Sequence, residues 1–317
     1  MHKSTRALLT FVLVYSPAML FSQPVFSPPV NLGPKINTSD VESDPFLTAD
    51  GKELFFTRSL DIWVSEWSDT GWTVAQKLGP QINLSVFFQQ SPSVSPDGQR
   101  LYYVDAERDG YNWDIWVSTW NPSINDWGTP VNLGPPVNTS GVEFSAHIAP
   151  DGMHLYFYSE TSDPDSLNPY GRCGFYVSEW NGSSWSVPMQ VAPNLGHCGN
   201  GSQYPSVTQE GMWFYYDRYV EDGKSIFVCE WDGLTWKPGI DLRSQIGGRA
   251  GTPSILPDGS RLFFASPDLG GYGSNDIFVA SQINLERVPG LTKEGRALLA
   301  ASLILIGIWS LFRVRAP

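Results

Sequence analysis

The chain has few of the side chains that bind transition metals. It contains only 3 cysteines and 4 histidines among 317 residues. The histidines are scattered along the sequence, at His2, His147, His154 and His197. Without a cluster of cysteine and histidine, a zinc site is not expected. Asp163 and Asp165 with Asn168 offer oxygen ligands for calcium but lack EF-hand spacing, so no metal is predicted.

Motifs for cofactors and for nucleophilic catalysis are also missing. No glycine-rich phosphate loop and no Ser-His-Asp arrangement occurs in the sequence. These absences exclude the enzyme classes that depend on such motifs. We therefore expect no cofactor.

Positive charge is scarce in the central part of the chain. Residues 23–287 hold 14 basic and 31 acidic residues, a net charge of −17. Such a surface repels nucleic acid and anionic lipid, so neither is an expected partner. The acidity also suits solubility outside the cell and by itself names no ligand. A neutral or cationic partner is predicted.

The first 22 residues resemble a secretory signal peptide. Lys3 and Arg6 provide the positive start, and an apolar stretch follows at residues 7–15. Cleavage can follow Ala18 or Ser22, and Ser22 is favoured. An uncleaved anchor is the alternative, but the apolar stretch is short and Pro17 interrupts it.

A second apolar stretch, residues 297–312, lies at the C-terminus. As a helix its 16 residues extend about 24 Å, slightly less than a hydrocarbon core of about 30 Å. Trp309, Arg313 and Arg315 fit a membrane span whose C-terminus is inside. The predicted domains are therefore a signal peptide at 1–22, one folded domain at 23–287 and a tail at 288–317.

Five copies of one pattern fill the central domain. Each copy has a short apolar strand, a tight turn, an aromatic strand and a third strand such as Asp-Ile-Trp-Val. The turns are Asp50-Gly51, Asp97-Gly98, Asp151-Gly152, Glu210-Gly211 and Asp258-Gly259. Successive turn glycines are 47, 54, 59 and 48 residues apart. A repeat of this length, made of strands and turns, predicts an all-β, five-bladed propeller.

The two ends of the repeat array predict how the ring closes. The last repeat stops after its third strand, near Ser281, whereas the first begins with an additional strand at residues 30–32. We expect this N-terminal strand to pair with residues 277–279 and complete the fifth blade, because closure removes exposed strand edges. The aromatic strand positions, such as Phe55 and Phe56, are assigned to packing between blades.

The repeats, with turns such as Pro96-Asp97-Gly98, resemble the WD40-like Pro-Asp-Gly repeat of TolB-type propellers over roughly residues 30–281. That resemblance implies an exported propeller that binds protein or glycan, and it implies no activity. The tail resembles a PEP-CTERM sorting signal of the Ile-Pro-Thr-Leu variant. Its motif residues are Val288, Pro289, Gly290, Leu291 and Thr292. The resemblance implies a processing enzyme of the exosortase type as a partner; a plain single-pass anchor is the alternative.

Two of the three cysteines are expected to form a disulfide bond. Cys173 ends the loop between the second and third strands of one blade, and Cys198 lies in the link to the next blade. Such loops and links share one face of a propeller, and an exported protein permits the bond. Cys229 lies within a strand and is predicted to be buried and unreactive.

The face that carries these loops and links, here named the loop-rich face, is the expected place for binding. Its long inter-strand loops are predicted at residues 105–112, 159–172, 217–224 and 266–275. Aromatic residues in or beside the loops and links are the candidate contacts for a sugar or protein: Phe87, Phe88, Tyr111, Tyr204 and Tyr272. The alternative is that these rings only pack the loops against the blades.

Catalysis would require acids that converge at the central channel, as in five-bladed glycosidases. The residues expected to face the channel from the inner strands are Phe46, Ser93, His147, Ser206 and Ser254. Only His147 among them titrates near neutral pH. Asp44 and Glu143, with Glu42, could converge above it, so Asp44, Glu143 and His147 are the candidate catalytic residues if the protein is an enzyme.

The sequence thus favours a protein of the cell envelope, tethered to the membrane or sorted to the surface, whose propeller lies outside the cytoplasm. Its predicted role is to bind an envelope glycan or protein. A carbohydrate-active hydrolase on the same fold and a passive surface scaffold are the alternatives.

Overall fold

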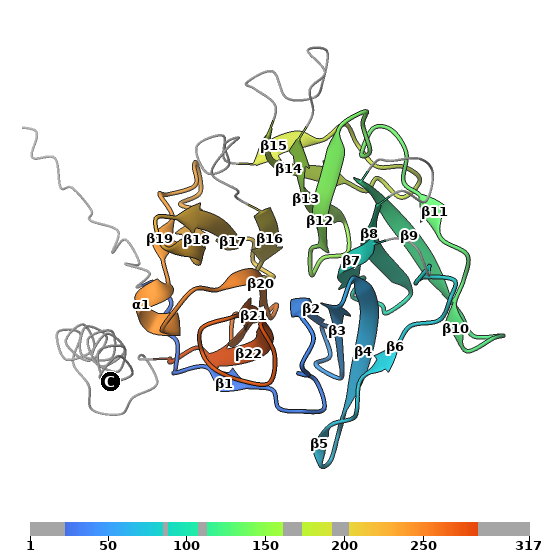
Figure 1. The fold of residues 1–317 in the computed structure, drawn as a ribbon. Coiled ribbons are helices and arrows are strands. Elements are labelled where there is room, and N and C mark those ends of the chain that lie inside the picture. The colour runs from blue at the N-terminus through green and yellow to red at the C-terminus, as the bar shows by residue number, and fades with distance from the viewer. Residues whose placement is uncertain (1–22, 85–87, 107–112, 161–172, 192–202, 285–317) are drawn as a thin grey trace, which may run out of the picture.

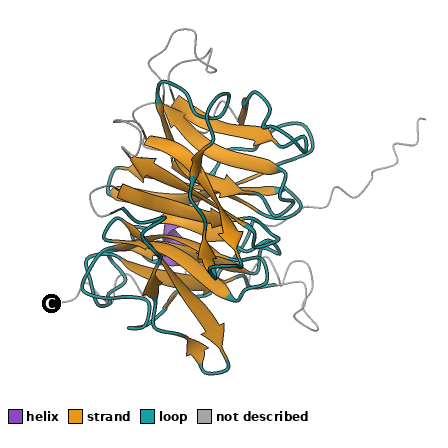
Figure 2. Cartoon of the chain, turned by 90° about the vertical axis from the view of Figure 1, so that its right-hand side faces the viewer, coloured by secondary structure: helices purple, strands orange, loops and turns teal. Residues whose placement is uncertain are grey.

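Five sheets surround a central channel in the computed structural model of the chain (Figure 1). The structure describes residues 23–84, 88–106, 113–160, 173–191 and 203–284. Seen from the side, the strands run between two faces, where the loops and turns lie (Figure 2). The predicted signal peptide and the tail lie outside the described residues.

Each sheet is an antiparallel blade whose first strand is innermost. Blade 1 contains β2 (Glu42–Leu47), β3 (Glu53–Arg58), β4 (Asp61–Ser68), β5 (Gly71–Trp72) and β6 (Gln76–Lys77). Blade 2 contains β7 (Phe88–Val94), β8 (Arg100–Ala106), β9 (Trp113–Asn121), β10 (Asp126–Trp127) and β11 (Val131–Asn132). Blade 3 contains β12 (Val142–Ile148), β13 (His154–Glu160), β14 (Cys173–Glu179) and β15 (Met189–Val191).

The remaining two blades follow the same order. Blade 4 contains β16 (Gln203–Val207), β17 (Trp213–Val220), β18 (Gly223–Glu230) and β19 (Ile240–Asp241). Blade 5 contains β20 (Gly251–Ile255), β21 (Arg261–Ser266) and β22 (Asp276–Ser281), with β1 (Val30–Asn31) as its outer strand. A short helix, α1 (Arg243–Ile246), lies in the link between blades 4 and 5.

The predicted closure of the ring is confirmed. Val30 pairs with Val279 and Asn31 with Phe278, and the Leu32 amide donates to the Ile277 carbonyl at 3.1 Å. The N-terminal strand therefore completes a blade whose other strands come from the far end of the domain.

The tight turns adopt the conformation that their glycines predict. Gly51, Gly98, Gly152, Gly211 and Gly259 have φ values between 63° and 72°. These values lie in the left-handed region, where a Cβ atom is unfavourable. The repeated signal, Asp-Gly in four blades and Glu-Gly in blade 4, thus marks the first hairpin of every blade.

The core lies between the blades, as the aromatic positions predicted. One cluster joins blades 2 and 3 by packing Tyr102 and Ile115 against Leu155 and Phe157. Equivalent clusters join the other neighbours, including blades 5 and 1, where Phe56 meets Phe263. Because every blade is buried against two others, the ring is stabilised mainly by apolar contact between sheets.

Three of the links between blades are held by a buried asparagine. Asn83 accepts a hydrogen bond from the Ile62 amide at 2.8 Å and donates one to the Ile62 carbonyl at 2.9 Å. Asn37 and Asn138 do the same for Ile277 and Ile115, respectively. Each asparagine therefore attaches the entrance of one blade to the third strand of the blade before it.

The loop predicted at residues 217–224 is wrong. β17 and β18 continue as a paired hairpin to Val220 and Gly223, which leaves a turn of two residues. These charged residues are part of the sheet: the Asp217 side chain is buried, and the Arg218 guanidinium lies 4.0 Å from the centroid of the Phe227 ring.

Within the described residues, no helix is long and apolar enough to cross a membrane.

Candidate functional site

Each of the five inner strands has a bulge where it reaches the channel. One residue in every bulge has a φ between 50° and 58°: Asp44, Ser91, Ser145, Tyr204 and Thr252. Residues other than glycine rarely adopt this conformation, and such strain is often kept at functional sites. Proline follows four of these residues, and Ala146 follows Ser145.

Side chains from neighbouring blades hold several of these bulges in place. The Asp44 amide donates to Thr252 Oγ1 at 3.1 Å, and the Thr252 amide donates to Asp217 Oδ2 at 2.9 Å. The Ser91 amide reaches Asp44 Oδ2 at 3.4 Å and Thr57 Oγ1 at 3.3 Å. The strained backbone is thus fixed by bonds that also join blades.

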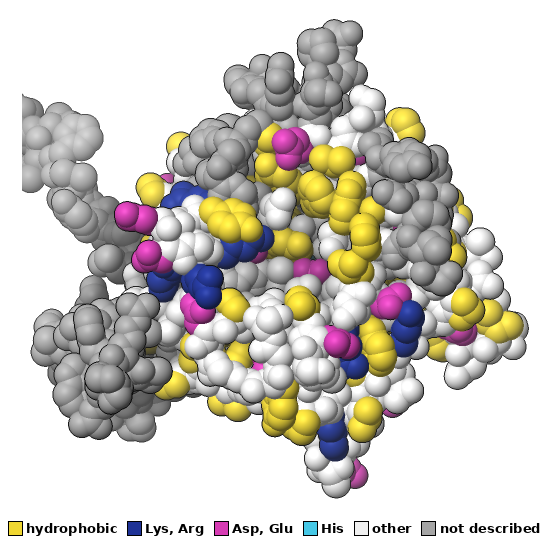
Figure 3. All heavy atoms as spheres, viewed as in Figure 1, with side chains coloured by type: hydrophobic (Ala, Val, Ile, Leu, Met, Phe, Trp, Pro, Cys, Tyr) yellow, Lys and Arg dark blue, Asp and Glu magenta, His cyan; other side chains and the backbone are white. Residues whose placement is uncertain are grey.

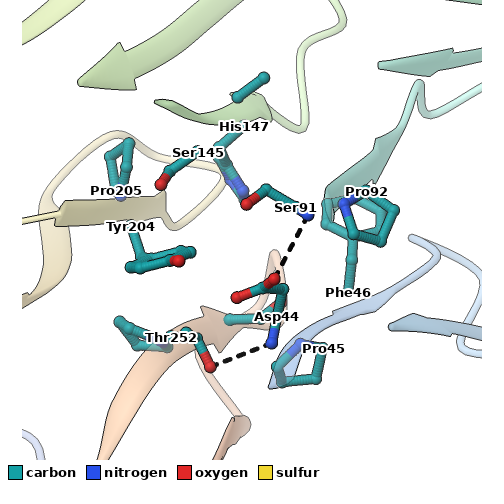
Figure 4. Close-up of a pocket in the computed structure, with 13 residues that line it drawn as sticks. Asp44, Pro45, Phe46, Ser91, Pro92, Ser145, His147, Tyr204, Pro205 and Thr252 are labelled. Carbon is teal, nitrogen blue, oxygen red and sulfur yellow. Dashed lines mark hydrogen bonds between the residues drawn. The ribbon is translucent and has the colours of Figure 1, made fainter. Parts of the chain in front are cut away.

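The channel mouth that these bulges form is narrow. Asp44, Ser91, Tyr204 and Thr252 face one another around it, and His147 also belongs to its lining (Figure 4). The cavity has a volume of about 30 Å³. This space suits one or two water molecules and is far below the roughly 300 Å³ at which small-molecule sites begin. A sugar ring does not fit inside the channel.

Two buried carboxylates lie beside the channel. Burial raises the pKa of Asp44, although Thr57 Oγ1 donates to its Oδ2 at 2.8 Å. Burial also raises the pKa of Asp217 to about 6, although Lys224 lies 3.2 Å from its Oδ2. The Oδ1 atom of each carboxylate is buried without a hydrogen-bond partner among the described residues. Burial and these two carboxylates raise the pKa of the Tyr204 phenol.

The expectation that His147 titrates near neutral pH is wrong. Burial lowers the pKa of His147 to about 4, and its Nε2 atom accepts a hydrogen bond from the Val207 amide at 3.4 Å. Its ring contacts the edge of Phe46, with centroids 5.8 Å apart. A neutral, hydrogen-bonded imidazole of this kind joins blades and is not poised to exchange protons.

The inner-strand residues expected to face the channel do so only in part. Phe46, His147 and Ser254 line it. Ser93 and Ser206 are fully buried and accept hydrogen bonds from the amides of Ile148 and Ile255 in the next blade. These serines therefore connect blades and are not available to a ligand.

The other candidate acids do not converge with Asp44. Glu143 is fully buried, where it accepts hydrogen bonds from the Thr139 backbone and from the hydroxyls of Thr139 and Ser159. Glu42 is paired with Arg58 at 2.9 Å. Both glutamates stabilise the links that precede their strands, because each bonds the threonine four residues before it.

Among the described aromatic candidates, Phe88 is the one that stacks on another aromatic ring. Its side chain is 40% exposed and stacks on Trp113, with centroids 6.2 Å apart and an interplanar angle of 18°. Trp113 in turn contacts Phe144, with centroids 5.2 Å apart. Phe88, Trp113 and Phe144 form an aromatic strip that crosses from blade 2 to blade 3.

The other predicted contact residues lie in different places. Tyr204 is part of strand β16 and lines the channel. Tyr272 is 51% exposed in the loop before β22, and its amide donates to Asp276 at 2.7 Å. Phe87 and Tyr111 lie outside the described residues.

A larger cavity, of about 300 Å³, opens beside the channel between blades 4 and 5. Its lining includes Tyr219, Lys224, Arg249, Thr252 and Asn275. The loop-rich face shows hydrophobic side chains over β12 and β13, and Lys and Arg side chains over β17, β18 and the segment before β20 (Figure 3). The charge on this face is therefore unevenly distributed.

The residues of this cavity and most of the bulges were not predicted from the sequence. A proline inside a strand pattern, as at Pro45, Pro92, Pro205 and Pro253, is a signal for a bulge and could have located them. No comparable signal joins Lys224 to Arg249, because tertiary packing brings strand β18 and the link before β20 together.

The cysteines agree with the predictions as far as the structure describes them. Cys229 is free and fully buried, as expected. Cys173 takes part in a disulfide bond. Cys198 lies outside the described residues, so the Cys173–Cys198 pairing stays a prediction.

We expect a count of one free thiol on denatured, non-reduced protein; a count of three would contradict the pairing.

The described residues bring together no three His, Cys, Asp or Glu side chains able to hold a metal ion. Asp163, Asp165 and Asn168 lie outside the described part of the chain. The sorting-motif residues 288–292 lie outside it as well.

No protein-family model matches the chain, and no curated protein matches it. Among solved structures, it is similar to the PQQ-bound form of aldose sugar dehydrogenase from Streptomyces coelicolor. That likeness has a TM-score of 0.51 and 13% identity, and covers 82% of this chain and 99% of the other. It shows a shared fold alone.

Two proteins of the TolB class are also similar in structure. The protein assigned as a TolB in Agrobacterium tumefaciens is 16% identical with a TM-score of 0.49, over 82% of this chain and 89% of the other. TolB from Acinetobacter baumannii is 14% identical with a TM-score of 0.43, over 77% of this chain and 55% of the other. Neither likeness carries information on activity.

Proposed function

We propose that this protein is an exported binding module whose loop-rich face binds an envelope glycan or protein without converting it. In this proposal, residues 1–22 direct export, and the tail at 288–317 tethers the propeller or is processed by a sorting enzyme. The observation that carries the binding role is the aromatic strip of Phe88, Trp113 and Phe144.

The strip has the features of a recognition surface for rings or apolar side chains. Phe88 is 40% exposed, and Trp113, on which it stacks, is held in strand β9. Aromatic residues supply large contact area with few rotatable bonds, so little conformational entropy is lost on binding. Their position on strands, in place of long loops, fixes the orientation in which they meet a ligand.

The narrow channel supports binding over hydrolysis. Its volume of about 30 Å³ excludes a sugar ring, and Glu143 is fully buried and bonded elsewhere. A retaining or inverting glycosidase needs two carboxyl groups on either side of a substrate bond. Among the described residues, the channel lining contributes only Asp44 as an acid.

The binding role can be tested with the purified full-length chain in a screen of glycans and envelope proteins. Phe88→Ala should weaken binding about tenfold, the effect expected for loss of one aromatic stack. Leu234→Ala is the matched control, because Leu234 is also an exposed hydrophobic residue but lies in the hairpin of the opposite face. Equal binding by both variants and the unchanged chain would contradict the proposal.

A hydrolase is the second candidate, and one observation favours it. The pKa of Asp217 is raised to about 6 next to Asp44, which is the kind of displacement found in catalytic acids. If the chain cleaves a glycan and both Asp44→Asn and Asp217→Asn abolish cleavage while the fold is retained, the hydrolase replaces the binding module as the better account.

A further inference from the structure

The cavity between blades 4 and 5 has the size of a small-ligand site. Its volume of about 300 Å³ matches the lower end of the range for such sites. Tyr219, 57% exposed, forms part of its wall, and Lys224 and Arg249 belong to its lining. The cavity therefore offers one aromatic ring and two cationic groups to a ligand.

Lys224 is held in place from two sides. Its Nζ atom lies 3.2 Å from Asp217 Oδ2, which accounts for one of the three N–H donors of an ammonium group. The same atom lies 5.0 Å from the centroid of the Tyr204 ring and 5.3 Å from that of Tyr219. These contacts orient the ammonium group before any ligand arrives.

Arg249 is fixed in a similar way by Asp268. Its Nε atom donates to both carboxylate oxygens, at 3.0 and 2.9 Å, and its Nη2 atom donates at 2.6 Å. The Arg249 backbone amide donates to the same carboxylate at 2.9 Å. This fork leaves Nη1 outside the pairing, so the guanidinium keeps donors for a second anion.

Two glycines allow these side chains to lie against the backbone. A Cβ atom at Gly251 would lie 2.8 Å from Asp217 Oδ2 and 3.3 Å from Lys224 Cδ. A Cβ atom at Gly223 would lie 2.6 Å from Arg249 Cδ. A larger residue at Gly251 would displace the Asp217 carboxylate that holds Lys224, and one at Gly223 would displace the Arg249 side chain, so the arrangement favours glycine at both positions.

We propose that this cavity binds the carboxylate-bearing unit of an acidic saccharide, such as a uronic acid residue. Lys224 and Arg249 bind the carboxylate, and the Tyr219 ring packs on the apolar face of the sugar. Asn275 donates through Nδ2 to the Glu42 carbonyl at 3.0 Å, which leaves its Oδ1 atom to accept a sugar hydroxyl. The inference rests on the proposed function, because it names the ligand class for the same face.

The negative charge of the domain does not oppose this ligand. Charges on a protein surface are screened over about 8 Å at physiological ionic strength, so acidic residues farther away contribute little inside the cavity. Asp217 and Asp268 lie close enough to offset Lys224 and Arg249, so the two cations bind the ligand through their remaining N–H donors and not through a net positive charge. A uronic acid unit carries one charge, whereas nucleic acid carries a dense series of charges that the acidic surface would repel. The cavity thus accommodates one saccharide unit that carries a single carboxylate.

The inference can be tested by calorimetry with the full-length chain and three probes: digalacturonic acid, its neutral counterpart galactobiose, and acetate. We expect digalacturonic acid to bind more tightly than both other probes. Arg249→Gln should weaken its binding about tenfold, and Tyr219→Ala about fivefold. Lys237→Gln should have no effect; Lys237 is a matched control because it is also paired with an acid, Glu230, at 2.7 Å. Melting curves of each variant identify losses that come from unfolding.

Each other outcome overturns the inference. If galactobiose binds as tightly as digalacturonic acid, the carboxylate is not recognised. If acetate binds as tightly as digalacturonic acid, the sugar ring is not recognised. If Arg249→Gln binds as the unchanged chain does, the cavity is not the site. When an envelope glycan still binds in a manner that depends on Phe88, the proposed function survives this result; when nothing binds, both fall.

Discussion

At the scale of single residues, burial favours the neutral form of both His147 and Asp217. It does so by lowering the pKa of the histidine and raising the pKa of the aspartate. The imidazole of His147 has a pKa of about 4, below its usual 6.5, and the carboxyl of Asp217 has a pKa of about 6, above its usual 3.8. Each displacement has the sign expected when the charged form is removed from water. The two groups therefore make opposite contributions to the pH dependence of stability.

His147 should destabilise the fold in acid. The unfolded chain binds a proton at His147 below about pH 6.5, whereas the folded chain does so only near pH 4. Stability from this group is thus complete above about pH 6.5 and is lost as the pH falls toward 4, by at most about 3 kcal/mol. His147→Asn should reduce this loss. The check is the free energy of unfolding at pH 7 and pH 4.5; an equal difference in both proteins would contradict the assignment.

Asp217 should act in the opposite direction. Its folded pKa of about 6 exceeds the unfolded value of 3.8, so the folded state holds more protons between these values. The contribution of Asp217 to stability is present below about pH 4 and is lost as the pH rises through 6. The melting temperature of Asp217→Asn, relative to the unchanged chain, should therefore increase from pH 4 to pH 7. If the difference in melting temperature between the variant and the unchanged chain stays constant, Asp217 is ionised over the whole range from pH 4 to pH 7.

At the scale of elements, the links between blades matter as much as the strands. The segments Gly33-Pro34, Gly79-Pro80 and Gly134-Pro135 each lead, three residues after the proline, to an asparagine that bonds the preceding blade. The strand pattern alone did not predict this function of the links. The buried asparagine satisfies backbone groups of an inner part of the sheet that water cannot reach.

Asn83→Ala should therefore destabilise the protein by about 2 to 3 kcal/mol. The change leaves the Ile62 amide and carbonyl without the side-chain partners that they now have at 2.8 and 2.9 Å. Gln76→Ala on the exposed strand β6 is the control and should have little effect. Urea unfolding of both variants measures the difference, and similar midpoints would rule out the proposed importance of Asn83.

At the scale of the whole molecule, one short strand determines whether the ring is closed. β1 joins residues near the N-terminus to β22, and Phe26 also forms a bridge to Gln282. Without these contacts, the outer edge of blade 5 would be exposed, and a sheet edge of this kind invites pairing with other chains. Closure should thus contribute both stability and resistance to aggregation.

Deletion of residues 24–34 should lower the melting temperature by at least about 10 °C, because several kcal/mol of pairing and packing are lost together. Val30→Ala is the control. It removes an exposed side chain from β1 but retains the backbone pairing with Val279. A deletion variant that melts with the unchanged chain would show that the ring does not need this strand.

The sequence by itself determined the class of fold, the number of blades and the closure. Strand alternation, the Asp-Gly turns and the unequal ends of the repeat array are local or periodic features, so they can be read without knowing which blades touch. It also identified Cys229 as a buried thiol, a property that follows from the position of a residue within its own strand. Phe88 was expected to be an exposed ring in the link between blades; it is exposed, but it is the first residue of strand β7.

Only the tertiary structure decided which side chains meet at the channel and in the cavity beside it. Glu143 and His147 proved to be buried and hydrogen-bonded, because the neighbouring link and the next blade provide their partners. Lys224 and Arg249 line one cavity, although Lys224 lies in strand β18, Arg249 lies in the link before β20, and no spacing in the sequence relates them. The net charge of the chain is a sum, whereas a ligand responds to the local field, and that field depends on which charges the packed blades bring within a few ångströms of one another.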